Sequence, residues 1–220
     1  MRRPGSMWSL ETLGRVRLSK YFFMREFLYS EIANFHQLQN IPDNPDLAIK
    51  AGEGLCGNLL DPMVETFGVV SVRSGLRSEA VNDFGNEHAL NCAKSVSDYA
   101  GHIWDRRDAA GHVGACATIV IPWFADQYAL GRDWRDLAWW VHDHLPYSEM
   151  QFFPKLCAFN LTWHEVPTRE IRTWIGGNGV LLRHAEQESE TKEQRRARYA
   201  DFPVFRGLRI PSPNLAKLPN

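Results

Sequence analysis

A histidine and two aspartates lie close together in the segment GHIWDRRD. They are His102, Asp105 and Asp108. A neutral imidazole and a carboxylate are suitable ligands for Zn²⁺ in a site that combines nitrogen and oxygen donors. The segment therefore predicts that one or both aspartates join His102 on a metal ion. The alternative is that the aspartates pair with the neighbouring Arg106 and Arg107 on a solvated surface.

A second histidine, His164, lies in the late segment NLTWHEV. Alternation along a strand puts Thr162 and His164 on one face of a sheet and Trp163 and Glu165 on the other. A histidine near the end of a late strand can complete a metal site that a loop begins. The alternative is a hydrogen-bonded histidine at the rim of the sheet.

Two further charged residues could serve the chemistry of a hydrolase. Glu149 precedes a largely apolar run, and a carboxylate beside aromatic surface can have its pKa raised and act as a general base. An exposed strand residue is the alternative for Glu149. Arg77 follows a turn at the end of a predicted strand, where a guanidinium can clamp a carboxylate or a developing oxyanion. The sequence contains no P-loop, dinucleotide-binding, nucleophile-elbow or H-E-x-x-H motif.

Apolar periodicity predicts the elements that must position these residues. Spacings of three and four predict helices over residues 20–37, 44–68 and 133–145, and Pro62 is expected to kink or split the second. Residues 78–93 are weakly helical with a break at Gly85, and residues 94–113 are expected to be a long loop. β-Branched and alternating runs predict strands over residues 69–72, 115–122, 148–153, 158–166 and 170–175, with a glycine turn at 176–179.

The order of these elements predicts a single α+β domain in which N-terminal helices pack on a small, mostly antiparallel sheet. We expect an irregular arm over residues 1–18, the domain over 19–180, and a charged, proline-rich extension over 181–220. The charged stretch after residue 185 is predicted to be a solvated helix or disordered. The end of the chain is expected to pack back on the body through Phe202, Val204 and Phe205.

Composition excludes several classes of protein. Lys and Arg number 25 against 26 Asp and Glu, so no global basic field would attract nucleic acid. No apolar run approaches the roughly 20 residues of a membrane helix, and the N-terminus has no apolar signal region, so we expect a cytoplasmic protein. The four cysteines are widely spaced, which predicts free buried thiols in a reducing compartment.

The first half of the chain resembles the M15-type zinc D,D-peptidases, a family of carboxypeptidases and endolysins that shares its fold with the hedgehog signalling domain. The resemblance covers about residues 19–82. Phe22, Glu26 and Ser30 approximate the family's F-x-x-x-E-x-x-x-S-like pattern, and the later turn is matched by Ser74, Gly75, Arg77, Ser78 and Asn82. The resemblance implies that Arg77 helps to hold substrate, with Ser74 and Asn82 beside it.

The second half matches the family's metal motifs less closely. His102 looks like the family's first zinc-binding histidine, and His164 looks like the closing one. The segment GACAT looks like the G-x-A-x-D turn, but Thr118 stands where the family has its metal-binding aspartate. Leu161 stands where the family has its catalytic acid.

Nearby acidic residues could replace the two lost groups. Asp105 or Asp108 could supply the ligand, if the inserted loop folds back. Glu149 or Glu165 could supply the base.

We therefore expect a zinc-dependent, peptidase-like hydrolase of a peptide amide, for which the resemblance implies a peptidoglycan-type substrate. Zn²⁺ held by His102, His164 and one of the two aspartates would lower the pKa of bound water toward ~7. Glu149 would accept the water's proton, and Arg77 would steady a substrate carboxylate or the oxyanion. The alternative is a non-catalytic protein of the same fold that binds a peptide or a partner protein in the former active-site cleft. Thr118 and Leu161 favour that alternative.

Overall fold

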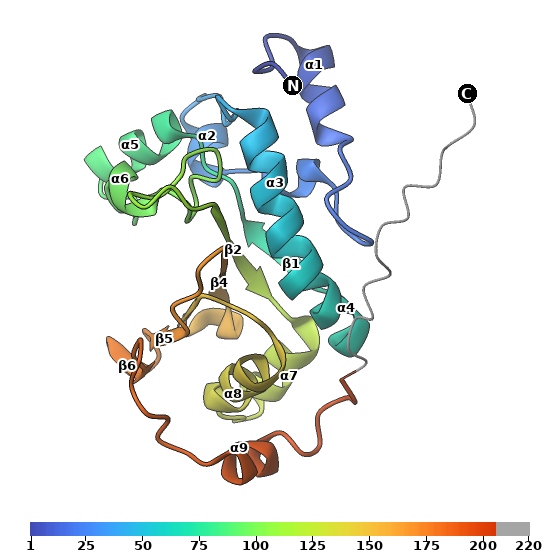
Figure 1. Ribbon diagram of the computed structural model, residues 1–220, viewed down its shortest axis with the longest axis vertical. Coiled ribbons are helices and arrows are strands. Elements are labelled where there is room, and N and C mark those ends of the chain that lie inside the picture. The colour runs from blue at the N-terminus through green and yellow to red at the C-terminus, as the bar shows by residue number, and fades with distance from the viewer. Residues whose placement is uncertain (206–220) are drawn as a thin grey trace, which may run out of the picture.

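The computed structural model describes residues 1–205 and contains one six-stranded sheet with helices on its buried side (Figure 1). The strand order is β1-β2-β4-β3-β5-β6, and every pair is antiparallel except β3 with β5. The strands are β1 Ser71–Ser74, β2 Gly114–Val120, β3 Glu149–Phe152, β4 Phe159–His164, β5 Glu170–Thr173 and β6 Gly179–Leu182. The prediction of an α+β fold with a mostly antiparallel sheet is confirmed.

The helices vary in length from one turn to about three turns. They are α1 Met7–Gly14, α2 Glu31–Phe35, α3 Pro45–Leu55, α4 Asp61–Phe67, α5 Glu79–Glu87, α6 Ser95–Asp98, α7 Pro122–Ala129, α8 Trp134–His144 and α9 Lys192–Arg198. Short 3₁₀ turns cover Met24–Phe27 and Lys155–Cys157. No helix within residues 1–205 has both the length and the apolar character to cross a membrane.

Helices α3 and α4 form one interrupted rod behind the sheet. Asn44 caps the start of α3 by accepting a hydrogen bond from the Leu47 amide at 3.2 Å. A π-helical turn over Cys56–Leu60 then separates α3 from α4, as predicted for a chain that must place Pro62 in a helix. Proline lacks an amide hydrogen and crowds the carbonyl four residues earlier, and the wider turn accommodates both effects. Gly68 ends α4 with a positive φ of 84°.

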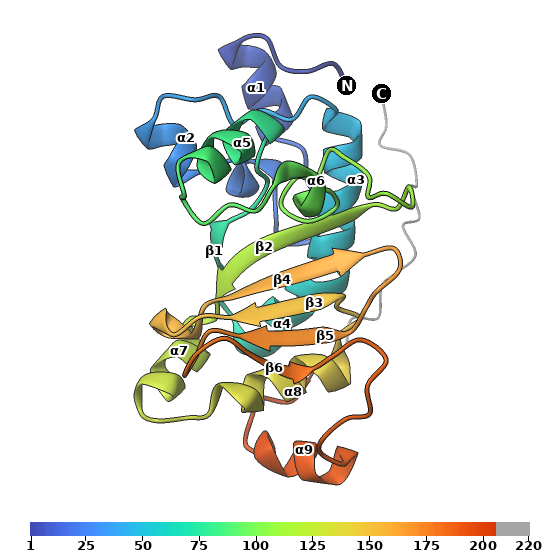
Figure 2. The same ribbon diagram turned by 90° about the vertical axis from the view of Figure 1, so that its left-hand side faces the viewer.

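The two faces of the sheet differ in character because side chains alternate along each strand. Leu161, Met150 and Ile171 point to the buried face and are at most 1% exposed. The opposite face carries His164 and Glu149, and Figure 2 looks onto this face, which α3 and α4 leave uncovered. The uncovered face is therefore the part of the sheet that is available for chemistry.

Several predicted elements differ from the structure near the N-terminus. The helix expected over 20–37 is wrong, because Arg17 pairs with Phe23 in an antiparallel bridge and Ser30 starts the separate helix α2. The arm is not irregular throughout, because a capping box between Ser6 and Ser9 starts α1. Helix α5 continues through Gly85, where a β-carbon would lie 2.4 Å from the Cys92 sulfur.

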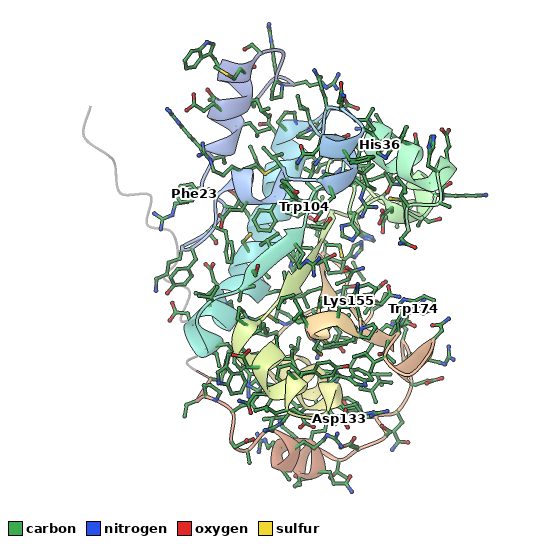
Figure 3. All side chains as sticks on the ribbon, turned by 180° about the vertical axis from the view of Figure 1, so that it is seen from behind. Phe23, His36, Trp104, Asp133, Lys155 and Trp174 are labelled. Atoms are coloured by element: carbon green, nitrogen blue, oxygen red, sulfur yellow. The ribbon has the colours of Figure 1, made fainter. Side chains whose placement is uncertain are left out.

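The predicted strands, which correspond to β1 to β5, and the helix over 133–145 are confirmed. Helix α7 and strand β6 are not among the predicted elements. The loop over 94–113 is confirmed apart from the single turn α6. Its anchor is Trp104, which is fully buried, packs 5.1 Å from the Phe27 ring and donates a hydrogen bond to the Cys116 carbonyl at 2.9 Å (Figure 3). Trp104 therefore fixes the middle of the loop against the core and β2.

The chain after β6 crosses under α8 and packs against it. Phe202 is 8% exposed among the rings of Phe67 and Trp123, and Phe205 contacts Trp140, as expected. Val204 is exposed, so the prediction that it packs on the body is wrong. Residues 206–220, with most of the predicted proline-rich end, lie outside the described residues. All four cysteines are free thiols, and three of them are buried.

Candidate metal centre

Asp108, His112 and His164 bring their ligand atoms within 4.8 Å of one another. The Asp108 Oδ2 atom lies 3.3 Å from His164 Nε2 and 3.4 Å from His112 Nδ1. The two imidazole rings are 5.7 Å apart between centroids and meet nearly edge to face. All three side chains are half-buried. Two imidazoles and one carboxylate make a ligand set suited to zinc.

A tight turn folds His112 back onto Asp108. The Asp108 carboxylate accepts hydrogen bonds from the backbone amides of His112 at 2.7 Å and Ala110 at 3.0 Å. Gly111 has a positive φ of 88°, which glycine adopts without strain. The backbone hydrogen bond from His112, followed by other donors in the turn, lowers the pKa of Asp108, so the carboxylate stays ionised.

The end of β4 positions His164. His164 lies opposite Gly114 of β2, and a β-carbon on Gly114 would lie 2.2 Å from the Ala100 carbonyl oxygen and 2.7 Å from the His164 ring. Only glycine leaves room for both groups. On the other face of β4, Trp163 covers Gly54 of α3, where a β-carbon would be 2.4 Å from the indole ring. The strand is therefore fixed from both sides.

The proton on His164 can be assigned from its neighbours. Nδ1 lies 2.8 Å from the Val166 carbonyl oxygen and 3.1 Å from the Val166 amide. A carbonyl can only accept, so the shorter contact assigns the proton to Nδ1. Nε2 then presents its lone pair toward Asp108, and the Val166 carbonyl fixes the ring as the outer partners of metal-binding histidines do.

Glu149 lies on the same face of the sheet as His164. It is opposite Thr162 in the β3–β4 pair, so Glu149 and His164 are diagonal neighbours on adjacent strands. The α-carbons of such neighbours are about 7–8 Å apart. Glu149 is exposed at the start of β3, as its alternative expected, while partial desolvation by the protein around the cleft, followed by the charge of Glu170, raises the pKa of its carboxyl. Within residues 1–205 the Glu149 carboxylate has no hydrogen bond or ion pair.

A cleft of about 370 Å³ connects these residues. It is lined by Asp108, His164, Glu149 and His102, together with polar side chains from β3 and β4. A second pocket, of about 390 Å³, lies between the N-terminal arm and α2, and no charged residue or histidine lines it. Only the first of these two spaces combines metal ligands with a candidate base.

Of the four predicted metal ligands, the structure brings Asp108 and His164 together and leaves out His102 and Asp105. Of the two aspartates that the sequence left as alternatives, Asp105 lies outside the group because its carboxylate contacts the start of α3. Its Oδ2 accepts hydrogen bonds from the amides of Asp43 at 2.6 Å and Asn44 at 3.1 Å, just before α3. The side chain is also in contact with Arg106 and is only 2% exposed.

His102 lies in the same cleft but outside the group of three. Its Nδ1 is 3.0 Å from the Gly75 carbonyl, and the residue is 7% exposed. Burial, and then the charge of Arg77, lowers the pKa of His102, so the ring stays neutral. The third member of the group, His112, was not selected from the sequence. The available signal was its position four residues after Asp108, with a glycine between them.

The predicted substrate contacts face the protein rather than the cleft. Arg77 Nη1 donates to Asn82 at 2.7 Å, to the Cys92 sulfur at 3.2 Å and to Asp98 at 3.4 Å. Asn82 is fully buried, so the prediction that it contacts substrate is wrong. Ser74 pairs with Thr118 at a bulge in β1, and neither Ser74 nor Arg77 lines the cleft.

The positions where the family's acidic groups were expected have other roles here. Thr118 donates a hydrogen bond to Asn160 at 2.6 Å, and Leu161 is fully buried on the far face of the sheet. Glu165 pairs with Lys50 at 2.7 Å and accepts a hydrogen bond from the Val113 amide at 2.8 Å, so it is not available as a base. Comparisons with family models, curated proteins and solved structures found no match to this chain.

Proposed function

We propose that this protein is a zinc-dependent hydrolase of peptide amides, with the metal held by Asp108, His112 and His164. The observation that carries the proposal is the approach of these three ligand atoms to within 4.8 Å of one another at a polar cleft. Three protein ligands leave one position of a tetrahedral site open for water, as catalytic zinc sites require.

The residues around that position have complementary roles. Bound zinc supplies a water of lowered pKa and polarises a carbonyl oxygen. Glu149, on the same face as His164 and without a partner in residues 1–205, would accept the proton of that water. Thr162, Asn160 and Gln151 continue the same face and offer hydrogen bonds to the main chain of a peptide. A peptidoglycan-type peptide and a hedgehog/D,D-peptidase fold belong to this proposal through the resemblance in the first half of the chain.

The second candidate is a non-catalytic protein that binds a peptide or a partner protein in the cleft. Thr118 and Leu161 favour it, because their places in the structure leave no acidic group where the resemblance expects one. In this case zinc binding would be absent, or it would occur without hydrolysis.

Zinc content and turnover distinguish the two candidates. We expect one zinc per chain by elemental analysis of the purified protein, and loss of that zinc in His112→Ala and His164→Ala. The matched control is His88→Ala, which changes an exposed histidine outside the cleft. Glu149→Gln should retain zinc and lose about 100-fold to 10,000-fold in kcat on peptidoglycan peptides.

The outcomes separate clearly. A folded, zinc-free wild-type protein would overturn the proposed metal centre. Stoichiometric zinc with binding of peptidoglycan peptides but no hydrolysis would favour the non-catalytic candidate.

A further inference from the structure

We propose that His102 is a specificity residue of this cleft, whose Nε2 accepts a hydrogen bond from an N–H group of the bound substrate. The inference rests on the proposed function, because it assumes a substrate seated at the Asp108–His112–His164 site. It goes further by naming a group that the substrate must present and the side chain that recognises it.

The hydrogen bonding of His102 identifies Nε2 as an acceptor. Nδ1 contacts the carbonyl oxygen of Gly75 at 3.0 Å, and a carbonyl can only accept, so Nδ1 carries the proton. In a neutral ring the other nitrogen is then an acceptor. Within residues 1–205, Nε2 has no hydrogen-bond partner, although the residue is 93% buried and lines the cleft. A polar atom in that position gains a hydrogen bond only from a ligand or from water.

The path of the chain places His102 beside the metal ligands. The Gly101 carbonyl accepts a hydrogen bond from the Cys116 amide at 2.9 Å, so this segment runs along β2. Gly114, two residues before Cys116, lies opposite His164. A β-carbon on Gly114 would meet both the Ala100 carbonyl oxygen and the His164 ring, so the segment that leads into His102 lies directly beside this metal ligand.

The charges of the cleft also favour a donor on the ligand. Its lining includes the carboxylates of Asp98, Asp108 and Glu149, and no lysine or arginine. A substrate that presents only carbonyl or carboxylate oxygens beyond the metal would face further acceptors. A site built around an acceptor rejects analogues that lack the donor, because the acceptor is then desolvated without a partner.

Two peptide hydroxamates test the inference on the full-length, zinc-loaded protein. The first is acetyl-Gly-Gly hydroxamate, which binds zinc through its hydroxamate and offers two amide N–H groups. The second is its sarcosine analogue, in which both of those amides are methylated. Isothermal titration should show wild-type protein binding the first about tenfold more tightly. His102→Phe, which keeps a ring but removes the acceptor, should bind both equally.

Each outcome has one meaning. Equal affinities in the wild type, or a preference that survives in His102→Phe, would overturn the role of His102. If His102→Phe does not fold, His102→Leu replaces it. The wild-type protein alone also tests the inference, because equal affinities for the two hydroxamates would contradict it. A wild-type protein that binds no zinc would contradict both the proposed function and this inference. A protein that binds zinc but does not discriminate between the two hydroxamates would contradict only the inference.

Discussion

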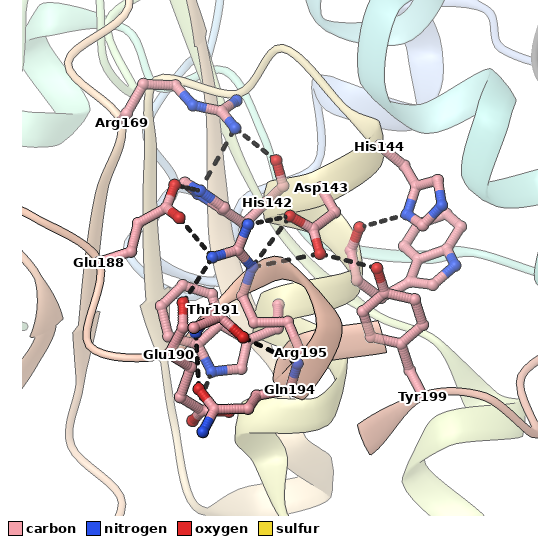
Figure 4. Close-up of polar contacts among 12 residues, drawn as sticks. His142, Asp143, His144, Arg169, Glu188, Glu190, Thr191, Gln194, Arg195 and Tyr199 are labelled. Carbon is pink, nitrogen blue, oxygen red and sulfur yellow. Dashed lines mark hydrogen bonds and ion pairs between the residues drawn. The ribbon is translucent and has the colours of Figure 1, made fainter. Parts of the chain in front are cut away.

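Two clusters of histidine and carboxylate in this molecule differ in how their charges are paired. In the C-terminal clamp, defined here as Arg132, Asp143, Glu188, Arg195 and Arg198, each charge has an opposite partner. Figure 4 shows Arg195 between Asp143 and Glu188. His142, beside the clamp, is held by the Tyr147 hydroxyl and by Glu188, each at 2.8 Å. In the cleft, by contrast, Asp108 meets two imidazoles and Glu149 has no partner within residues 1–205.

The difference separates a cluster that stabilises the fold from one that is available to a ligand. Arg195 is 4% exposed and donates to both Asp143 and Glu188, so neither carboxylate is free to coordinate a metal. Asp108 is oriented by backbone amides alone and its other oxygen faces two histidines. Proximity of histidine and carboxylate therefore predicts a metal site only where no arginine occupies the carboxylates.

The largest expected effect is on stability and lies in the C-terminal clamp. Arg195→Met removes one partner of a buried ion pair and leaves Asp143 with an uncompensated charge. We therefore expect the free energy of unfolding to fall by about 3–5 kcal/mol. Urea denaturation measures this change. Zinc affinity should be unaltered, and a loss below about 1 kcal/mol would show that the clamp is not a stabilising network.

The next effect is on the metal. His164→Ala removes a direct ligand, and because losing even an outer partner of a metal ligand costs 10-fold to 100-fold in affinity, we expect a loss of at least about 100-fold. Competition with a zinc chelator measures it, with urea denaturation as the check on folding. His142→Ala should change stability and leave zinc affinity alone. Loss of zinc in His142→Ala, with zinc retained in His164→Ala, would contradict the distinction between the cleft and the clamp.

A smaller effect should follow from Gly54→Ala, which probes how the fold positions His164. The added methyl group would displace the Trp163 ring on the far face of β4, at a cost of about 1–3 kcal/mol. We expect weaker zinc binding together with reduced stability. Gly57→Ala is the matched control, because a β-carbon there meets no atom within 4 Å. Zinc binding that matches the control would mean that β4 does not depend on this contact.

The smallest effect concerns acid. Burial alone would raise the pKa of Asp143, but hydrogen bonds from Arg195 and Tyr199 outweigh it and lower the pKa below its usual value. A depressed pKa contributes stability that is present above about pH 4 and is lost as the pH falls through the folded-state value. Urea unfolding at pH 5, 4 and 3 should show this decline. In the double variant Asp143→Asn, Arg195→Met the decline should be shallower, and an unchanged slope would assign it to other carboxylates.

Local patterns in the sequence were sufficient for the elements that hold the site. The apolar run of β2, the alternation that puts Thr162 and His164 on one face, and the break at Pro62 each follow from short-range physics. The helix expected over 20–37 failed because the bridge between Arg17 and Phe23 is a tertiary contact that periodicity does not contain. Helix α7 was missed because its amphipathic pattern is short and begins at a proline.

The site was harder to predict than the fold because its geometry depends on a turn. Asp108 and His164 were selected as ligands, but His112 reaches them only through the bend at Gly111. Asp105 and Asp108 have the same side chain and differ in what the backbone offers them, which is the start of α3 for one and a cleft for the other. Composition and spacing do not carry that distinction.

Two of the three proposed ligands belong to one turn, whereas the third is at the end of a strand that follows some fifty residues later in the chain. A cation held there would join a surface loop to the rim of the sheet, in the manner of a cross-link. Removing the cation with a chelator would free the loop around Arg107. The peptide bond that follows Arg107 would then be more susceptible to trypsin. The ion would then govern the shape of the cleft as well as the chemistry inside it.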